Sequence, residues 1–170
     1  MFEHLLNKYP IYKNELDTFC EGLKKGKMSF VCIGGKYLHR MVKDMSKYIH
    51  RHLLCYRMGE YNDHYALQRL LGTDVSNDKC KSLLQEVKRY PECIILVDDF
   101  ECANLSVVHF FSKLLEEKEY DHIDFKHAIL IFNVKGMNAN IGFKKNKDVG
   151  VLFPGVSIQT DEIIYFTKQD

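Results

Sequence analysis

A loop that could bind phosphate is the first chemistry that this sequence suggests. The apolar run 30–33 is followed by Gly34, Gly35 and Lys36, and then by apolar residues at helical spacing. Phosphate-binding loops place backbone N–H groups around the anion, while a lysine reaches the β- and γ-phosphates. Two adjacent glycines make a very short loop of this kind. A plain strand-to-helix turn with a solvated lysine explains the same residues, and we favour it over residual anion binding.

Paired acids at the end of an apolar run are the second chemical signal. The run 94–97 is the most apolar in the chain and ends in Asp98 and Asp99. In such a place a first acid can hold a magnesium ion and a second can polarise the water that attacks a phosphate. The alternative is a strand end whose acids cap the next turn or helix, and the sequence leaves both interpretations open.

The pattern of apolar residues predicts the elements that would position these groups. Continuous apolar runs predict five strands, at 29–34, 53–58, 93–100, 127–134 and 161–166. Period-3.6 spacing predicts helices over 3–25, broken once near Pro10, and over 36–54, 62–71, 77–90 and 105–119. Apolar strands that alternate with helices predict an α/β fold, a three-layer αβα sandwich around a five-stranded, mostly parallel sheet. Ligands of such sheets bind at the carboxyl ends of the strands.

Composition sets the size and class of the chain. Its 170 residues are 46% hydrophobic and 28% charged, which predicts one domain over 1–170, with a helical segment at 1–27 and an α/β core at 28–168. The formal charge of +1 gives no field that would gather nucleic acid or an anionic membrane, so we expect neither as a partner. The first residues lack a signal-peptide pattern and no run reaches membrane-span length, so we expect a cytoplasmic protein.

A zinc site is the other chemistry that the composition raises. The six cysteines form no C-x-x-C pair, which favours reduced thiols. His50, His52 and Cys55 lie close together in the sequence, but structural zinc needs four ligands at characteristic spacings. We therefore interpret this stretch as the basic end of a helix.

Five segments, taken in order, carry a resemblance to a known family. They are RMGEYNDHYALQRLLG at 57–72, LLQEVKRYPECIILVDDFECAN at 83–104, IDFKHAILIFNVKG at 123–136, IGFKKNKD at 141–148 and FPGVSIQTDEIIYF at 153–166. Together they resemble the large domain of Clp-type AAA+ protein unfoldases, which are chaperone ATPases. The resemblance implies a P-loop-like fold in which Gly34, Gly35 and Lys36 stand for the phosphate loop. It also implies that Asp98 and Asp99 stand for the Walker B acids and Asn133 for a sensor.

The same alignment shows where the sequence departs from the family pattern. Four residues are missing between Gly34 and Gly35, and Tyr37 replaces the Ser or Thr that would hold magnesium. Asp99 replaces a glutamate, and Gln159 stands at the position of the arginine finger. Residues 73–77 offer no pore-loop pattern, and we expect no C-terminal helical lid after the fifth strand.

These departures suggest a degenerate AAA+ domain that keeps the fold and loses the ATPase. We expect no cofactor, ATP and magnesium binding that is weak at best, with Asp98 as a weak magnesium ligand, and at most a weak ATPase. The predicted role is protein binding, as an adaptor, cap or inhibitor whose partner is a AAA+ ring or related subunit. The alternative is an ATP-binding and hydrolysing subunit of a hetero-oligomeric chaperone whose missing site elements come from a partner. A clamp-loader-like or nucleic-acid-associated fragment is a weaker alternative, against which the near-neutral charge argues.

Overall fold

Five parallel strands form the central sheet of the protein, in a computed structural model that describes residues 3–35, 37–73, 82–135, 150–153 and 156–166. Across the sheet they are β2 (Leu53–Arg57), β3 (Ile94–Asp98), β6 (Ile129–Val134), β1 (Ser29–Ile33) and β9 (Glu162–Tyr165). Every neighbouring pair is parallel. The five predicted strands are therefore confirmed, and the sheet is parallel throughout.

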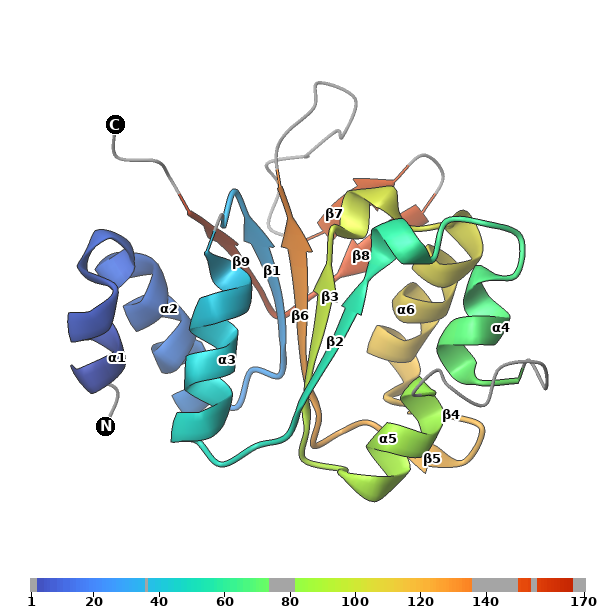
Figure 1. Cartoon of the computed structure of the whole chain (residues 1–170), viewed down its shortest axis with the longest axis horizontal. Coiled ribbons are helices and arrows are strands. Elements are labelled where there is room, and N and C mark those ends of the chain that lie inside the picture. Colours follow the sequence, from blue (N-terminus) through green and yellow to red (C-terminus); the bar gives the residue numbers. More distant parts are fainter. Residues whose placement is uncertain (1–2, 36, 74–81, 136–149, 154–155, 167–170) are drawn as a thin grey trace.

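Helices cover both faces of this sheet and make three layers (Figure 1). One face carries α1 (Glu3–Lys8), the short 3-10 helix η1 (Pro10–Tyr12), α2 (Lys13–Lys24) and α3 (Leu38–Tyr48). The other carries α4 (Ala66–Leu71), α5 (Leu83–Arg89) and α6 (Leu105–Glu117). Two further 3-10 turns are η2 (Met58–Glu60) and η3 (Phe100–Cys102). The predicted αβα sandwich is confirmed, and the helical segment 3–25 is interrupted at Pro10 as expected.

The apolar strands divide their side chains between two cores. In β1, Phe30 and Cys32 pack against α2 and α3, whereas Val31 and Ile33 face the core under α6. All five residues of β1, all five of β3 and all six of β6 are buried. Both sides of these strands must therefore be apolar, which is why they have no polar alternation in the sequence.

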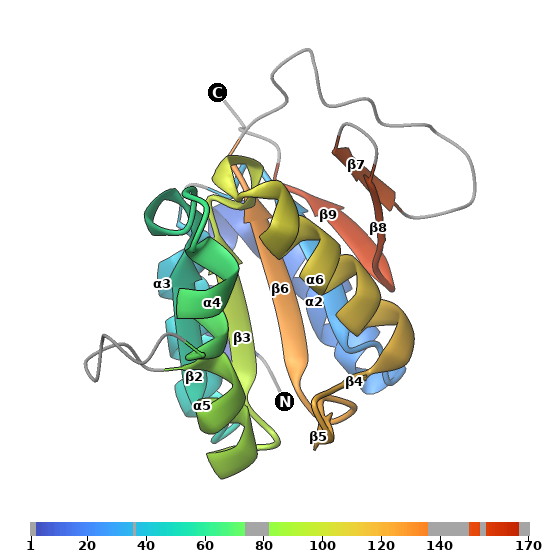
Figure 2. The same ribbon diagram turned by 90° about the vertical axis from the view of Figure 1, so that its right-hand side faces the viewer.

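Two small hairpins were not predicted. β4 (Glu119–Tyr120) pairs with β5 (Ile123–Asp124), and β7 (Gly150–Phe153) pairs with β8 (Val156–Gln159), both antiparallel. Figure 2 shows the second hairpin beside α6, against which β8 packs. These strands have only two or four residues each, which is too short for a clear alternation of apolar and polar residues.

Several predicted helices end earlier or start later than expected. The helix predicted over 105–119 ends at Glu117 because Lys118 takes a positive φ of 56°, which ends the helical turn. The helix predicted from residue 62 begins at Ala66, since Asp63 instead accepts a hydrogen bond from the Tyr65 amide in a preceding turn. None of the helices in the described ranges is long and apolar enough to cross a membrane.

Asp161 fastens the last strand of the sheet to the first. Its Oδ2 atom accepts hydrogen bonds from the amides of Met28 and Ser29, both at 2.9 Å, and from the Ser29 hydroxyl at 2.8 Å. Burial alone would raise the pKa of Asp161, but these hydrogen bonds outweigh it and hold that pKa below its ordinary value. One carboxylate therefore sets the register in which β9 begins beside β1.

Replacing Asp161 should destabilise the fold in a pH-dependent way. We expect Asp161→Ala to lower the free energy of unfolding by about 1–2 kcal/mol at pH 7, since it leaves the buried Ser29 amide unpaired while the lost carboxylate is itself partly exposed. Because the folded-state pKa is lowered, this stabilisation is present above the unfolded value of about 3.9 and is lost as pH falls through the folded pKa. Urea unfolding at pH 7 and pH 3 measures it, with Asp17→Ala as the control. An equal deficit at both pH values would contradict the assignment.

Candidate functional site

The carboxyl ends of β1, β3 and β6 meet at one edge of the sheet, at the upper edge in Figure 1. From β1 the chain runs through α3 to β2, at one edge of the sheet. From β6 it runs to β9, at the opposite edge, so the two connections leave neighbouring strands in opposite directions. Such a reversal of strand order is where open parallel sheets bind ligands. We call this edge the strand-end corner, and define it by Gly34, Gly35, Asp98, Asp99 and Asn133.

The Gly34 amide is used inside the fold. Gly34 has φ of 79°, and its N–H donates to the carbonyl of Val134 at 2.9 Å. The amide of Phe166 in turn donates to the carbonyl of Ile33 at 2.8 Å. A Cβ atom at Gly34 would lie 2.9 Å from the Phe166 carbonyl oxygen, so the strained φ and the close backbone both require glycine. The Gly34 amide is directed to β6 instead of to a ligand.

Gly35 is buried in the turn that starts α3. Its carbonyl accepts a hydrogen bond from the Leu38 amide at 3.1 Å, and an added Cβ would lie 2.9 Å from Leu38 Cβ. The same Cβ would lie 3.6 Å from the Phe166 ring and 3.7 Å from Asn133 Oδ1. Gly35 is therefore a close-packing position in which any side chain would displace its neighbours. Lys36 lies outside the described residues, so its role stays a prediction.

Asp98 and Asn133, predicted as separate site residues, are in direct contact. They end adjacent strands, and Asn133 Nδ2 donates to Asp98 Oδ1 at 2.6 Å. The same oxygen accepts the amide of Asp99 at 3.2 Å. Both side chains are buried, with Asp98 7% and Asn133 3% exposed, and Asn133 Oδ1 has no partner among the described residues. Gly35, Asn133 and Asp98 are thus neighbours in this order across the carboxyl ends of the strands.

The second acid, Asp99, pairs with a lysine that sequence reasoning missed. Asp99 is buried, adopts a left-handed conformation with φ of 54°, and its Oδ1 lies 2.5 Å from Lys135 Nζ. The Asp99 carboxylate raises the pKa of Lys135 above its ordinary value, so the lysine stays charged. The Lys135 amide also donates to Glu101 Oε1 at 3.2 Å. A polar residue directly after β6 must lie at the same edge as one directly after β3, which is the signal that could have found Lys135.

Gln159, predicted to stand at the arginine-finger position, lies apart from the main sheet. It is exposed at the end of β8, the strand that packs against α6. The sequence predicted no strand there, because the whole segment before 161 was interpreted as a connection. Gln159 has a neutral side chain, so this position cannot neutralise charge on a phosphoryl group.

The charge of the strand-end corner is uneven. Among the described residues, the carboxylates of Asp98, Asp99 and Glu101 all interact electrostatically with the ammonium group of Lys135. Among the residues that the structure describes, no three His, Cys, Asp or Glu side chains are grouped so that they could hold a metal ion. The Asn133–Asp98 hydrogen bond and the Lys135–Asp99 ion pair hold the ends of β3 and β6 together.

Comparison with known proteins identifies the family to which the chain belongs. A model of the AAA domain family (Cdc48 subfamily) matches residues 24–164, and the chain belongs to this family. Over 104 residues the chain is 27% identical to the probable ATP-dependent Clp protease ATP-binding subunit of Chlamydia pneumoniae, a match that covers 55% of this chain and 12% of that protein. Over 100 residues it is 30% identical to chaperone protein ClpB of Staphylococcus aureus strain COL, which covers 54% of this chain and 11% of ClpB.

A solved structure agrees with this class. The closed state of Hsp104 with ATPγS and FITC casein superposes with a TM-score of 0.64 at 16% identity, and the match covers 92% of this chain and 32% of the Hsp104 chain. At this identity the likeness shows the fold. The protein therefore contains a Clp-type AAA+ domain, as its five sequence segments indicated, and spans about a tenth of the length of the ClpB and Clp protease relatives.

Removing Lys135 should let divalent cations approach the acids of the strand-end corner. We expect Lys135→Met to bind Mn²⁺ about fivefold more tightly at low salt, because the +1 charge beside Asp99 is gone; water around the exposed ammonium limits the gain. Paramagnetic broadening of the amide signals of Phe100 and Glu101 measures the affinity.

Lys113→Met is the matched control, since the Lys113 side chain has the same exposure as that of Lys135, 63%, and pairs with Glu117 elsewhere on α6. The interpretation is wrong if Lys135→Met and the wild type bind Mn²⁺ equally well.

Proposed function

We propose that this chain is a catalytically degenerate AAA+ domain that acts as a protein-binding module, an adaptor, cap or inhibitor of a Clp-like AAA+ partner. The observation that carries the proposal is the ion pair between Asp99 and Lys135. An acid that polarises water needs a free carboxylate oxygen directed at that water. Here one of the two oxygens of Asp99, Oδ1, is 2.5 Å from the Lys135 ammonium group of the same chain.

The phosphate side of the same corner supports the proposal. A phosphate loop needs several free N–H groups, and the Gly34 amide is already bonded to the Val134 carbonyl. The carbonyl oxygen of Phe166, a hydrogen-bond acceptor that repels anions, lies against Gly34. Asp98 is the predicted weak magnesium ligand, and one of its two carboxylate oxygens, Oδ1, already accepts two hydrogen bonds. The described residues of the corner therefore do not fit a magnesium nucleotide, and no reaction step is assigned to them.

The fold itself supports a role in protein binding. The whole sheet and both helical layers are kept although the corner is altered, and broad faces of such a domain can dock against another subunit. Near this corner, Tyr65 is 64% exposed and Leu105 is 50% exposed. They stand at the N-terminal ends of α4 and α6, and these helices pack against each other. Exposed apolar side chains of this size are typical of surfaces that partners cover.

Nucleotide should not stabilise the protein. We expect the melting temperature to stay unchanged when 1 mM ATP and magnesium are added, because the Gly34 amide and one oxygen each of Asp98 and Asp99 are already bonded within the chain. Binding with a dissociation constant of 10 μM would instead stabilise the fold by about 2.7 kcal/mol, or roughly 5–10 °C. An active Clp-type ATPase domain in the same buffer serves as the positive control. A magnesium-dependent rise would favour the alternative of an ATP-binding subunit completed by a partner.

An association with AAA+ subunits should depend on the exposed apolar residues near the strand-end corner. We expect the tagged chain, mixed with a purified Clp-type ATPase, to co-elute with it in size-exclusion chromatography. The double variant Tyr65→Ser and Leu105→Ser should weaken the association at least tenfold. Tyr90→Ser is the control, because Tyr90 is exposed beyond α5, after which the chain enters β3 at the amino-terminal edge of the sheet. Failure of the wild-type chain to associate with a Clp-type ATPase would remove this partner from the proposal.

A further inference from the structure

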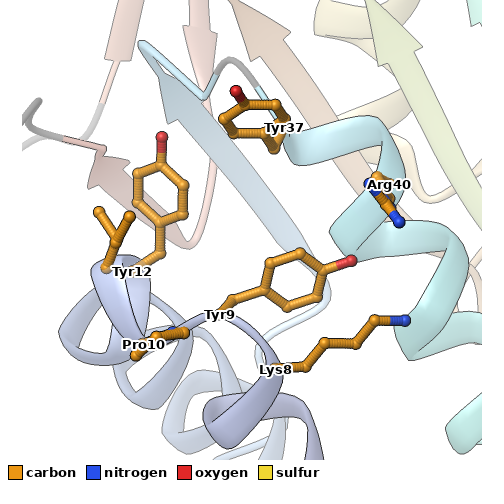
Figure 3. Close-up of a pocket in the computed structure, with 7 residues that line it drawn as sticks. Lys8, Tyr9, Pro10, Tyr12, Tyr37 and Arg40 are labelled. Atoms are coloured by element: carbon orange, nitrogen blue, oxygen red, sulfur yellow. The ribbon is translucent and has the colours of Figure 1, made fainter.

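A pocket of about 310 Å³ lies away from the acids of the strand-end corner, between the first helical segment and α3. Figure 3 shows Tyr37, just before α3, and Arg40, in α3, on one side of it, and Lys8, Tyr9, Pro10 and Tyr12, from the end of α1 to the end of η1, on the other. Its size suits a ligand of one or two rings. Three of these residues are tyrosines, so most of the wall is aromatic with hydroxyl groups at its edges.

Two of the aromatic walls are held in place by their own contacts. The Tyr9 hydroxyl donates to Asp44 Oδ2 at 2.5 Å. Burial and the Asp44 carboxylate raise the pKa of Tyr9 to about 12, so Tyr9 is neutral at physiological pH. The Tyr12 ring packs edge-on against Phe166, with ring centres 5.4 Å apart. Walls that are already ordered cost little conformational entropy when a ligand binds.

Among the described residues that line the pocket, Arg40 is the cation without a carboxylate partner. Lys8 is neutralised by Asp44, at 2.6 Å. Arg40 forms no ion pair with a carboxylate of the described ranges, and its guanidinium lies on the first turns of α3 beside the pocket. A guanidinium binds a carboxylate through two parallel hydrogen bonds, which fixes the position of the acid as well as its charge. The pocket therefore offers tyrosine rings against which an aromatic ring can pack, and a guanidinium that can pair with a carboxylate.

Phe166 separates this pocket from the strand-end corner. On one side its backbone and ring close over Gly34 and Gly35, and on the other its ring meets Tyr12. Tyr37, which is 49% exposed, forms the part of the wall that a ligand would cover. The pocket can accordingly be tested without reference to the acids of the corner.

We propose that this pocket binds a small aromatic carboxylate, whose ring packs against Tyr9, Tyr12 and Tyr37 and whose acid group pairs with Arg40. Stacking against tyrosine requires a flat apolar ring, and the Arg40 guanidinium requires a negative charge. This inference goes beyond the proposed function and does not depend on it.

A pair of isosteric probes tests the proposal on the whole chain. We expect 2-naphthoate to bind with a dissociation constant of about 1 mM or tighter, as suits a ligand of this size in an open pocket. The uncharged 2-naphthamide should bind about tenfold more weakly, since it keeps the ring and loses the charge-assisted hydrogen bonds. Cyclohexanecarboxylate, which keeps the acid without the flat ring, should also be weaker. Titration followed by amide chemical shifts of Tyr12, Tyr37 and Arg40 locates the site.

Two variants separate the contribution of the charge to ligand binding from that of the aromatic ring. Arg40→Gln should weaken 2-naphthoate about tenfold and leave 2-naphthamide unchanged, while Tyr37→Ala should weaken both. Arg57→Gln, at the end of β2 and outside the pocket lining, is the control for total charge and should bind 2-naphthoate as the wild type does. Unchanged amide spectra elsewhere show that each variant is folded.

Three results would overturn the proposal. They are no shift at 10 mM 2-naphthoate, equal affinity of wild type and Arg40→Gln, and shifts that map outside the pocket. Displacement of 2-naphthoate by 1 mM magnesium-ATP would replace the aromatic carboxylate by a nucleotide, and would contradict the proposed function too. If 2-naphthoate does not bind and ATP has no effect, only the present inference is contradicted. The failure of this inference can therefore be distinguished from the failure of the proposed function.

Discussion

Burial of a parallel sheet on both faces is the constraint on which the rest of this structure depends. β1, β3 and β6 are covered by helices on either side, so their side chains are apolar throughout and polar groups can emerge only at their ends. Because the strands are parallel, all the carboxyl ends emerge at one edge. Gly34, Asp98 and Asn133, which are far apart in the sequence, are brought together by that geometry alone.

Several polar groups of the strand-end corner are paired within the chain, although Asn133 Oδ1 has no partner among the described residues. The Gly34 amide, the Asp98 carboxylate and the Asp99 carboxylate are each bonded to another residue of the protein. Groups that are paired in this way have little to gain from an outside ligand, because each new bond must replace an existing one. The same pairing stiffens the sheet edge by joining β1 to β6 and β3 to β6. The corner therefore has a fixed shape where these groups are paired.

Phe166 links the two regions of interest in the molecule. Its backbone continues the pairing of β9 with β1 and closes over Gly34, while its ring supports Tyr12 at the pocket. Residues at the end of β9 therefore shape both the turn after β1 and the aromatic wall beside α3. The pocket lined by Tyr9, Tyr12 and Tyr37 and the strand-end corner are neighbours on either side of Phe166. Their described charges differ in sign, because the pocket has the Arg40 guanidinium and the corner has the carboxylates of Asp98 and Asp99.

The sequence by itself determined the five strands, the helices between them and the class of the protein. Those features follow from local composition, since apolar runs such as 94–97 can be stable only when buried, and from the order of segments that a family keeps. It also singled out Asp98, Asp99, Asn133 and the two glycines, although not their contacts. Only the tertiary structure decided that Lys135 neutralises Asp99, that Phe166 closes over Gly34 and that three tyrosines line one pocket. Those contacts join residues that are distant in the sequence, and a periodic pattern carries no information about which partner a side chain will meet.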